Sequence, residues 1–529
     1  MIWILLVVLT AVVAVWQFYV KPLKYWSDRG VKQTNPWIFF GDLVSTSFRT
    51  ISFAEWGDYV YKMYPDARYV GCYQFNKPTL VIRDPELLKQ IMVKDFDSFM
   101  DHQPLFSDQS DPLWSKNLFA LRGQKWKNMR NILSASFTSS KMKYMFSLML
   151  DAVDDFTNHF VEKNEDFIEV EMKDVFTRLA NDVIATTAFG IKVDSLTNPQ
   201  NEFYLHGKEA TDLTGIIINL KFLGYLLVPW FFEAFKIPFF NRKIRNFYNT
   251  IVGDTIKARE EQNIVRPDMI NILLEARKGL SNKYMNRNAT NMDDYSDELV
   301  EKLKSKRIVE LTDQDITSQA MIFFLAGFDP LSTTMCFAFY ELACNPDAQD
   351  KLRKEILEVL EHTNGKVTYE NLVGMKYLDM VVSETLRKWS VSPLSDRVCT
   401  KPYVIEPVSP EERPVHLNPG DLIMTASYSV QRDPKYFPDP EKFDPERFSD
   451  ENKNNIVPYT YFPFGVGPRA CIGSRFAILE VKAILFRLIS KFEFIPTAKT
   501  QIPLVLCKKN FNLFAEGRFW MGLKRLQTY

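Results

Sequence analysis

The sequence predicts one large, mainly helical globular unit over residues 21–529, preceded by a membrane-spanning helix over residues 1–20. The 529 residues contain no Gly/Ser-rich or Pro-rich linker and no internal repeat, so we expect a single domain. Apolar residues make up 46% of the chain and aromatic residues 14%, which is enough for a large core and an apolar cavity. The clearest periodic segments, residues 312–344 and 474–492, are typical of helices.

The charge balance and the cysteines narrow the class of protein. Lysine plus arginine and aspartate plus glutamate each number 65, so we expect no nucleic-acid partner. Six cysteines are scattered without a disulfide framework or a chelating pair, which is typical of a reducing compartment. They are Cys72, Cys336, Cys344, Cys399, Cys471 and Cys507.

The first twenty residues contain no charged side chain and just reach the length that crosses a bilayer. Lys21 and Lys24 follow directly, while no basic residue precedes the segment, so the rest of the chain is expected on the cytosolic side. A cleaved signal peptide is the alternative, because Ala11 and Ala14 are small residues near a possible cleavage point. The missing basic n-region and the length of the apolar run favour an anchor.

The most polar stretch, residues 278–307, is expected to be an exposed connection between two helices. It contains the single glycosylation sequon of the chain, Asn288-Ala289-Thr290. If the globular unit is cytosolic, Asn288 stays unmodified.

The segment 312–344 begins with a capping box formed by Thr312 and Asp315 and ends at Asn345-Pro346. Gly327 in its middle costs a helix about 1 kcal/mol relative to alanine, so its presence needs a reason. Pro330 removes a backbone N–H and leaves the carbonyl group of Ala326 without its helical donor.

Two further patterns are a pair of opposite charges on a predicted helix and a lone cysteine in front of another. Glu384 and Arg387 lie three residues apart on a predicted helix and can pair on one face. Cys471 lies in a glycine-rich loop just before the helix 474–492, where the helix dipole and free N–H groups are expected to keep its thiolate deprotonated. A lone thiolate argues against zinc, which needs four ligands, but suits the axial position of a haem. The alternative is a buried structural cysteine beside a turn.

Four motifs in order resemble the cytochromes P450. The family's haem-binding loop is matched by Phe464, Gly465, Gly467, Arg469, Cys471 and Gly473. The Glu-x-x-Arg of its K helix is matched by Glu384-Thr385-Leu386-Arg387, and the segment that supplies a second arginine is matched by Pro445-Glu446-Arg447-Phe448. The Trp-x-x-x-Arg of its C helix is matched by Trp126-Lys127-Asn128-Met129-Arg130. The resemblance extends from about residue 36 to the C-terminus.

The resemblance implies a mainly α fold with small β-sheets (α+β) that holds haem b, iron protoporphyrin IX. It implies that Cys471 ligates the iron and that Gly473 leaves room for the macrocycle. Glu384, Arg387 and Arg447 would form a structural cluster that fixes the cysteine loop. The expected haem contacts are Trp126, Arg130, Arg397, Phe464 and Arg469, with His102 as a further candidate beside the alternative of a lone surface histidine.

The resemblance assigns oxygen activation to Ala326-Gly327-Phe328-Asp329, with Gly327 leaving space for dioxygen and Asp329 in a proton relay. The threonine usual at the next position is Pro330 here. We hypothesise that Pro330 builds in the distortion that the threonine hydroxyl otherwise holds open, with Ser332 or Thr333 as substitute hydroxyls. The alternative is that Pro330 only kinks a long helix.

The resemblance places the substrate cavity among aromatic and aliphatic side chains that favour flat, apolar ligands. The candidates are Phe106, Trp114, Phe119, Phe324, Phe328, Leu394 and Phe514. Residues 226–240 are unusually apolar and are expected to insert into the membrane, with an ordinary core helix as the alternative.

The chain has no dinucleotide-binding glycine motif, so its electrons are expected from NADPH–cytochrome P450 reductase, with cytochrome b5 as a second candidate donor. Residues 96–102 and 323–329 look like the insect microsomal type, closest to family nine and then family six. The resemblance implies a monooxygenase of the endoplasmic reticulum membrane that oxidises lipophilic plant toxins and insecticides. The alternatives are a P450-fold peroxide isomerase or dehydratase, a biosynthetic P450 for an endogenous lipophile, and a non-catalytic haem protein.

Overall fold

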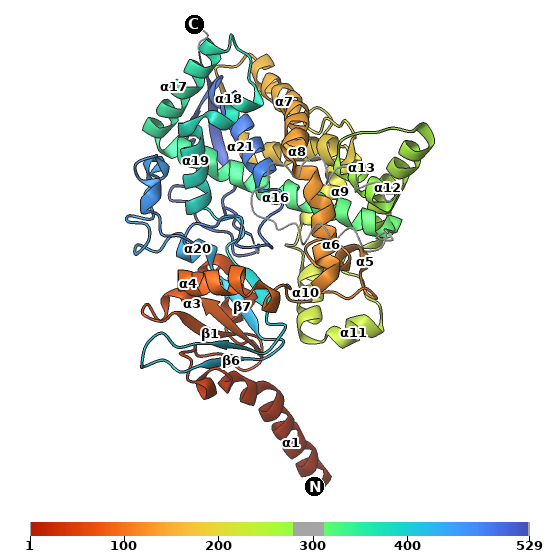
Figure 1. Cartoon of the computed structure of the whole chain (residues 1–529), viewed down its shortest axis with the longest axis vertical. Coiled ribbons are helices and arrows are strands. Elements are labelled where there is room, and N and C mark those ends of the chain that lie inside the picture. The colour runs from red at the N-terminus through yellow and green to blue at the C-terminus, as the bar shows by residue number, and fades with distance from the viewer. Residues whose placement is uncertain (1, 279–310, 511, 527–529) are drawn as a thin grey trace.

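The computed structural model describes residues 2–278, 311–510 and 512–526. Helices dominate, and the strands form three small sheets among these residues (Figure 1). The prediction of a mainly α fold with small β-sheets is therefore confirmed. The sequon at Asn288, and all of the predicted polar connection except Lys278, lie outside the described residues.

The largest sheet has four strands in the order β1-β2-β7-β4. β2 pairs antiparallel with β1 and parallel with β7, and β7 pairs antiparallel with β4. An isolated bridge between Asp101 and Val398 attaches the segment after η5 (Phe96–Ser98) to the edge strand β4. The strand bounds are β1 (Tyr69–Gln74), β2 (Lys77–Ile82), β3 (Phe167–Glu171), β4 (Ser395–Val398), β5 (Tyr403–Ile405), β6 (Val415–Leu417), β7 (Leu422–Thr425), β8 (Phe492–Ile495) and β9 (Trp520–Arg525), and the smaller sheets are β3-β9-β8 and β5-β6.

Helix α16 (Asp313–Cys344) crosses the middle of the molecule (Figure 1). Its predicted capping box is present, with both Thr312 and Asp315 side chains bonded to backbone N–H groups. The longer helices around it are α3 (Phe53–Lys62), α6 (Gly123–Ser134), α7 (Ser139–Glu162), α8 (Met172–Ile184), α9 (Glu202–Thr211), α10 (Ile216–Leu227), α12 (Arg242–Gln262), α13 (Met269–Arg277), α17 (Pro346–His362), α19 (Lys376–Lys388) and α21 (Ser474–Ile489). Shorter ones are α2 (Val44–Ser47), α4 (Pro85–Lys89), α5 (Pro112–Ser115), α11 (Pro229–Ala234), α18 (Tyr369–Gly374), α20 (Ser427–Val430) and the 3-10 helices η5 (Phe96–Ser98) and η9 (Pro445–Phe448).

Helix α16 belongs to two separate apolar cores. Its residues from Ile316 to Phe328 pack in a core with α6, α9, α12 and α13. Its residues from Leu331 to Ala343 pack in another core with α7, α8, α19 and α21. The change from one core to the other falls at the part-buried Asp329 and Pro330, where the sequence predicts the chemistry of the helix.

Helix α21 is shorter than its sequence pattern predicts. The helix ends at Ile489, and Phe492 already begins β8. Phe492 and Phe494 are buried there in the core that α21 also borders, so burial in the sheet replaces a further helical turn.

The N-terminal segment continues as one apolar helical stretch from Ile2 to Lys24, with none of its apolar window buried. Helix α1 (Ile2–Val15) projects away from the globular part in Figure 1. Helix α16 also has the length and apolar character of a membrane span, but 61% of its window is buried, as expected for a core helix.

The apolar segment 226–240 was expected either to insert into the membrane or to form a core helix, and the structure exposes one part of it and buries another. Trp230 and Phe235 are each 66% exposed, whereas Phe239 and Phe240 lie in the core. The exposed part includes α11, which lies with the preceding α10 toward the same end of the long axis as α1 (Figure 1).

Candidate active site

The loop that carries Cys471 is shaped by two glycines with positive φ. Gly465 has φ of 78° and Gly467 has φ of 75°, a conformation that other residues adopt with strain. A Cβ on Gly467 would also lie 2.0 Å from the carbonyl oxygen of Met92. The N–H of Cys471 then donates to the carbonyl oxygen of Phe464 at 2.8 Å, which closes the loop just before α21.

Cys471 is enclosed by protein and yet keeps an accessible side chain. Burial raises the pKa of the Cys471 thiol above its usual value, and this outweighs the N–H of Gly473 and the charge of Arg130, which lower it. In this structure burial therefore opposes the effect of the helix terminus on the Cys471 pKa, and the deprotonated thiolate stays a prediction. A metal ion would supply the missing positive charge, because coordination deprotonates a thiol.

Ala326 is the one exposed residue of α16 between Ile316 and Ala343, a stretch that is described throughout. Phe137 connects this part of α16 with the cysteine loop: its ring stacks on Phe323 at 5.8 Å and lies 3.8 Å from a Cβ built on Gly473. Ala326 and Cys471 thus both keep accessible surface, and Phe137 contacts the segment next to each of them.

Gly327 and Asp329 differ from Ala326 in their surroundings. A Cβ on Gly327 would lie 2.3 Å from the Cδ1 of Ile184 on α8, so any larger residue would have to displace this side chain, and packing against α8 also favours glycine. Asp329 is 33% exposed and accepts a hydrogen bond from Lys173 at 2.8 Å. Thr333 is fully buried and accepts from the same ammonium group at 2.7 Å.

Arg397 on β4 is buried beside His102. Its Nη1 donates to the carbonyl oxygen of Asp396 at 2.6 Å, while its Nε has no hydrogen-bond partner among the described residues. His102 is also buried, and its Nδ1 lies 3.0 Å from an Asp396 oxygen. The alternative of a lone surface histidine is therefore wrong, because the bridge from Asp101 to Val398 draws His102 against the sheet edge.

Arg469 is held mainly by backbone oxygens. Its guanidinium group donates to the carbonyl groups of Met100, Leu118, Phe119 and Leu121, at 2.6 to 3.3 Å. The same group lies 4.2 Å above the ring of Trp126 on α6. Arg469 thus ties the cysteine loop to residues 100–121 with most of its donors.

The buried charges in this region fit the haem that the sequence predicts. Burial lowers the pKa of Arg397 to about 10, although Asp396 raises it, and burial together with the charges of Arg397 and Arg130 lowers the pKa of Arg469 to about 9. The Asp396 carboxylate is already shared with His102 and with the N–H of Gln103. A haem carries two carboxylates, which would supply the missing negative charge, and Arg397 has free donors for one of them.

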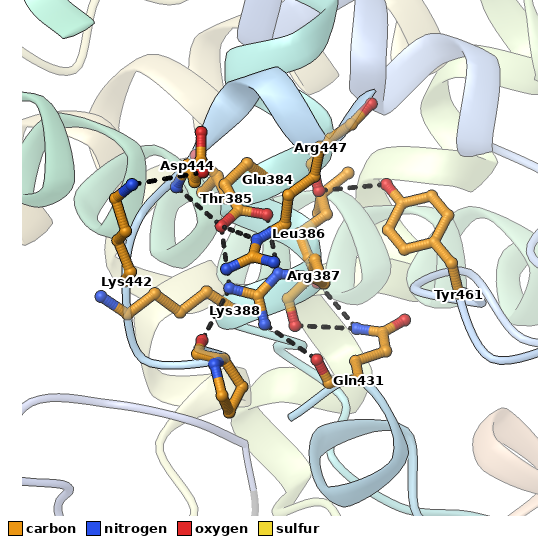
Figure 2. Close-up of polar contacts among 12 residues, drawn as sticks. Glu384, Thr385, Leu386, Arg387, Lys388, Gln431, Lys442, Asp444, Arg447 and Tyr461 are labelled. Atoms are coloured by element: carbon orange, nitrogen blue, oxygen red, sulfur yellow. Dashed lines mark hydrogen bonds and ion pairs between the residues drawn. The ribbon is translucent and has the colours of Figure 1, made fainter. Parts of the chain in front are cut away.

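Glu384 and Arg387 on α19 form a fully buried pair (Figure 2). Arg387 donates to both carboxylate oxygens, at 2.7 and 2.8 Å, and Arg447 of η9 lies 3.5 Å from the same carboxylate. Burial raises the pKa of Glu384 despite Arg387, which lowers it. The structure thus brings together the three residues of the predicted cluster.

Gln431 connects this cluster to the cysteine loop, a link that the sequence did not suggest. Its amide group donates to the carbonyl oxygens of Leu386 and Arg387, and its oxygen accepts from the N–H of Phe462 (Figure 2 shows the first two bonds). Phe462 in turn accepts from the N–H of Gly465. The side chain comes after α20, where no motif marks it.

The predicted substrate contacts separate into core and accessible residues. Phe324 and Phe328 are almost completely buried and stack on each other at 5.0 Å, so they line no open space here. Leu394 packs on Gly57 of α3. Phe119 is 43% exposed and stacks on His102 at 4.3 Å. The remaining three are Phe106, Trp114 and Phe514. Phe106 is buried against Trp114 and Phe239, and Phe514 packs edge-on to Phe519.

Comparison with known proteins agrees with this geometry. The family model for Cytochrome P450 matches residues 32–518. "Cytochrome P450 9e2" of Blattella germanica is 43% identical over 515 residues, 94% of this chain and 93% of that protein. "Probable cytochrome P450 9f2" of Drosophila melanogaster is 40% identical over 511 residues, 94% of each chain. "Cytochrome P450 6k1" of Blattella germanica is 36% identical over 513 residues, 96% of this chain and 94% of that protein. The predicted similarity to insect families nine and six is confirmed, and the chain belongs to the cytochrome P450 family of haem enzymes.

Proposed function

We propose that the protein is a haem-thiolate monooxygenase that oxidises lipophilic foreign compounds, such as plant toxins and insecticides. The observation that carries the proposal is the accessible Cys471, whose loop Phe137 connects to the part of α16 that exposes Ala326, together with the buried Arg397, whose Nε has no hydrogen-bond partner among the described residues. When bound there, haem b would supply dioxygen activation.

The protein's own residues would each take a limited part in this reaction. The sulfur of Cys471 would be the protein's iron ligand, and Arg397, Trp126 and Arg130 would surround the haem carboxylates. Asp329 would take protons from water and pass them on beside the Ala326 carbonyl group, which Pro330 leaves without its helical N–H donor. Glu384, Arg387 and Arg447 would keep the cysteine loop in place through Gln431 and Phe462.

We place the protein in the endoplasmic reticulum membrane, held by residues 1–20 with residues 21–529 on the cytosolic side. The uncharged apolar helix and the lysines that follow it support this topology. Electrons would come from NADPH–cytochrome P450 reductase, with cytochrome b5 as a second donor. Lys125 and Lys127 on α6 are candidates for the contact with an acidic partner, although Lys127 already pairs with Asp97 at 2.9 Å.

The test is turnover of the membrane-bound protein with the reductase, NADPH, isotopically heavy dioxygen and a panel of lipophilic toxins. Heavy oxygen in a product supports the proposal, and the amount of labelled product per NADPH consumed measures the coupling. NADPH consumption without labelled product from any toxin contradicts it.

Pro330 favours one competing function, a peroxide isomerase or dehydratase of the same fold, because such an enzyme needs no threonine for proton delivery. Lipid hydroperoxides without NADPH are its test substrates. If the protein converts lipid hydroperoxides but forms no labelled product with NADPH, the isomerase or dehydratase function replaces the monooxygenase proposal. If it forms labelled product only from an endogenous lipophile, it is a monooxygenase whose substrates are not foreign compounds.

A further inference from the structure

Lys173 on α8 extends its ammonium group into α16 at the position of Pro330. Its Nζ lies 2.8 Å from the carboxylate of Asp329, 2.8 Å from the hydroxyl of Ser332 and 2.7 Å from that of Thr333. The carbonyl oxygen of Asp329 is a fourth acceptor at 3.1 Å. The side chain of Lys173 is only 13% exposed, so these bonds form largely away from solvent.

An ammonium group has three protons and no lone pair, so each hydroxyl that faces it must accept and direct its own proton elsewhere. Ser332 donates its proton to the carbonyl oxygen of Phe328, at 2.7 Å. No acceptor for the Thr333 hydroxyl is found in the described parts of the chain. Lys173 therefore sets the orientation of both hydroxyls that the sequence suggested as substitutes for the missing threonine.

Asp329 is left with one oxygen for other partners. Its Oδ1 accepts from Lys173, whereas Oδ2 has a long contact of 3.4 Å from the amide of Asn512. With 33% of its side chain exposed, Asp329 can exchange protons with water through Oδ2. The contacts fix one oxygen and leave the other accessible, as a proton carrier requires.

We propose that Lys173 is a positioning residue for proton delivery: it holds Asp329, Ser332 and Thr333 in place at the break that Pro330 makes in the backbone hydrogen bonding of the continuous helix α16. The inference rests on the proposed monooxygenase function. Lys173 keeps its own protons throughout. Each proton that Asp329 takes from water at Oδ2 is handed to water beside the Ala326 carbonyl group, which restores the carboxylate.

A purely structural role is the competing explanation, because Lys173 also joins two packed helices (Figure 1). Lys388 provides a matched control. It is 12% exposed and pairs at 2.8 Å with Glu341, which lies on the same helix α16 and is 2% exposed. Removing either lysine leaves a carboxylate of α16 without its ammonium partner, but only Lys173 contacts the residues at the break.

The experiment compares Lys173→Met, Lys173→Arg and Lys388→Met in the haem-loaded full chain with reductase. The readouts are labelled product and hydrogen peroxide per NADPH. Removal of a positioned proton donor costs on the order of 100-fold or more, so loss of positioning alone should lower the product per NADPH of Lys173→Met by about tenfold, with the difference released as peroxide. Lys173→Arg should recover most of it, and Lys388→Met should match wild type.

A second readout is independent of turnover. Hydrogen–deuterium exchange of peptides covering residues 326–336 should increase in Lys173→Met and stay at the wild-type level in Lys388→Met. The inference is overturned if exchange at residues 326–336 is unchanged in Lys173→Met. It is also overturned if the product per NADPH of Lys173→Met lies within twofold of wild type or equals that of Lys388→Met. Absence of labelled product from the wild-type protein would instead refute the proposed function.

Discussion

Arg397 and Arg469 are two buried guanidinium groups that differ in how many donors they have already used. Arg469 donates most of its N–H groups to four backbone carbonyl oxygens. Arg397 keeps an unbonded Nε among the described contacts, and burial lowers its pKa to about 10. A buried cation that lacks an anion destabilises the protein until a ligand supplies one.

We therefore predict that Arg397→Met weakens haem binding more than Arg397→Lys does, because methionine removes the charge. The rate of haem transfer to a haem-free globin measures this, and we expect it to rise about tenfold or more for the loss of one charge-assisted hydrogen bond. Arg353→Met is the control, because Arg353 pairs with the exposed Asp350 on α17. Equal transfer rates for the two methionine variants would contradict a haem contact.

Asp182 on α8 provides a pH-dependent prediction away from the haem region. Burial raises the pKa of Asp182 from 3.8 to about 6, although hydrogen bonds from Ser195 and Asn181 lower it. Because the folded state binds this proton more tightly than the unfolded state, the contribution of Asp182 to stability falls as pH rises from about 4 to 6. The difference between a pKa of 3.8 and one of about 6 corresponds to about 3 kcal/mol at most.

Asp182→Asn should therefore gain stability relative to wild type as the pH rises through that window. Urea unfolding at pH 4.5 and 7 measures the difference, with the exposed Asp66→Asn as control. A stability difference that is the same at both pH values would show that Asp182 does not titrate there.

Local motifs predicted part of the site and could not predict the rest. Cys471, Glu384 and Arg387 are each recognisable from neighbours within ten residues. Lys173 meets Asp329 across 156 residues and Gln431 meets Arg387 across 44, so only the fold brings them together. The burial of Phe324 was also missed, because helical spacing alone does not distinguish a core face from a cavity wall.

At the scale of the element, α16 is continuous through Pro330 even though proline interrupts the backbone bonding of a helix. We predict that Pro330→Ala raises the free energy of unfolding, by up to about 3 kcal/mol. It should also lower the product formed per NADPH, because the new N–H would bond the Ala326 carbonyl group.

Pro346→Ala is the matched control, since Pro346 occupies the first position of α17, where an N–H has no helical acceptor. It should change stability by less than about 0.5 kcal/mol. If Pro330→Ala stabilises the protein without changing coupling, Pro330 only bends the helix and the relay hypothesis fails.

The cluster between α19 and η9 makes a different kind of prediction, because both partners of its central pair have no exposed surface. Arg387→Met leaves the Glu384 carboxylate buried without its main partner, which costs about 3–5 kcal/mol. Arg447 is 12% exposed and more distant, so Arg447→Met should cost clearly less. Urea unfolding and haem content measure both variants. Equal losses would mean that the pair does not organise the cysteine loop.

At the scale of the whole molecule, α10 and α11 lie toward the end from which α1 projects (Figure 1). Ile217, Trp230 and Phe235 of the α10–α11 region are 66% to 75% exposed. Trp37 and Phe48, which precede α3, are each 67% exposed. A surface of this kind is unfavourable in water but favourable in the boundary of a bilayer, so we infer two regions of membrane contact.

We predict that a chain without residues 2–20 still binds vesicles, through the α10–α11 region. Adding Trp230→Ser and Phe235→Ser should lower the bound fraction by on the order of tenfold or more, since burying one such side chain contributes about 1.5–3 kcal/mol. Leu357→Ser with Val408→Ser is the control, because these residues are 50% and 69% exposed outside this region. Vesicle flotation measures all three proteins. If the shortened chain does not float, α1 alone holds the protein to the membrane, and the exposed aromatic residues need another explanation.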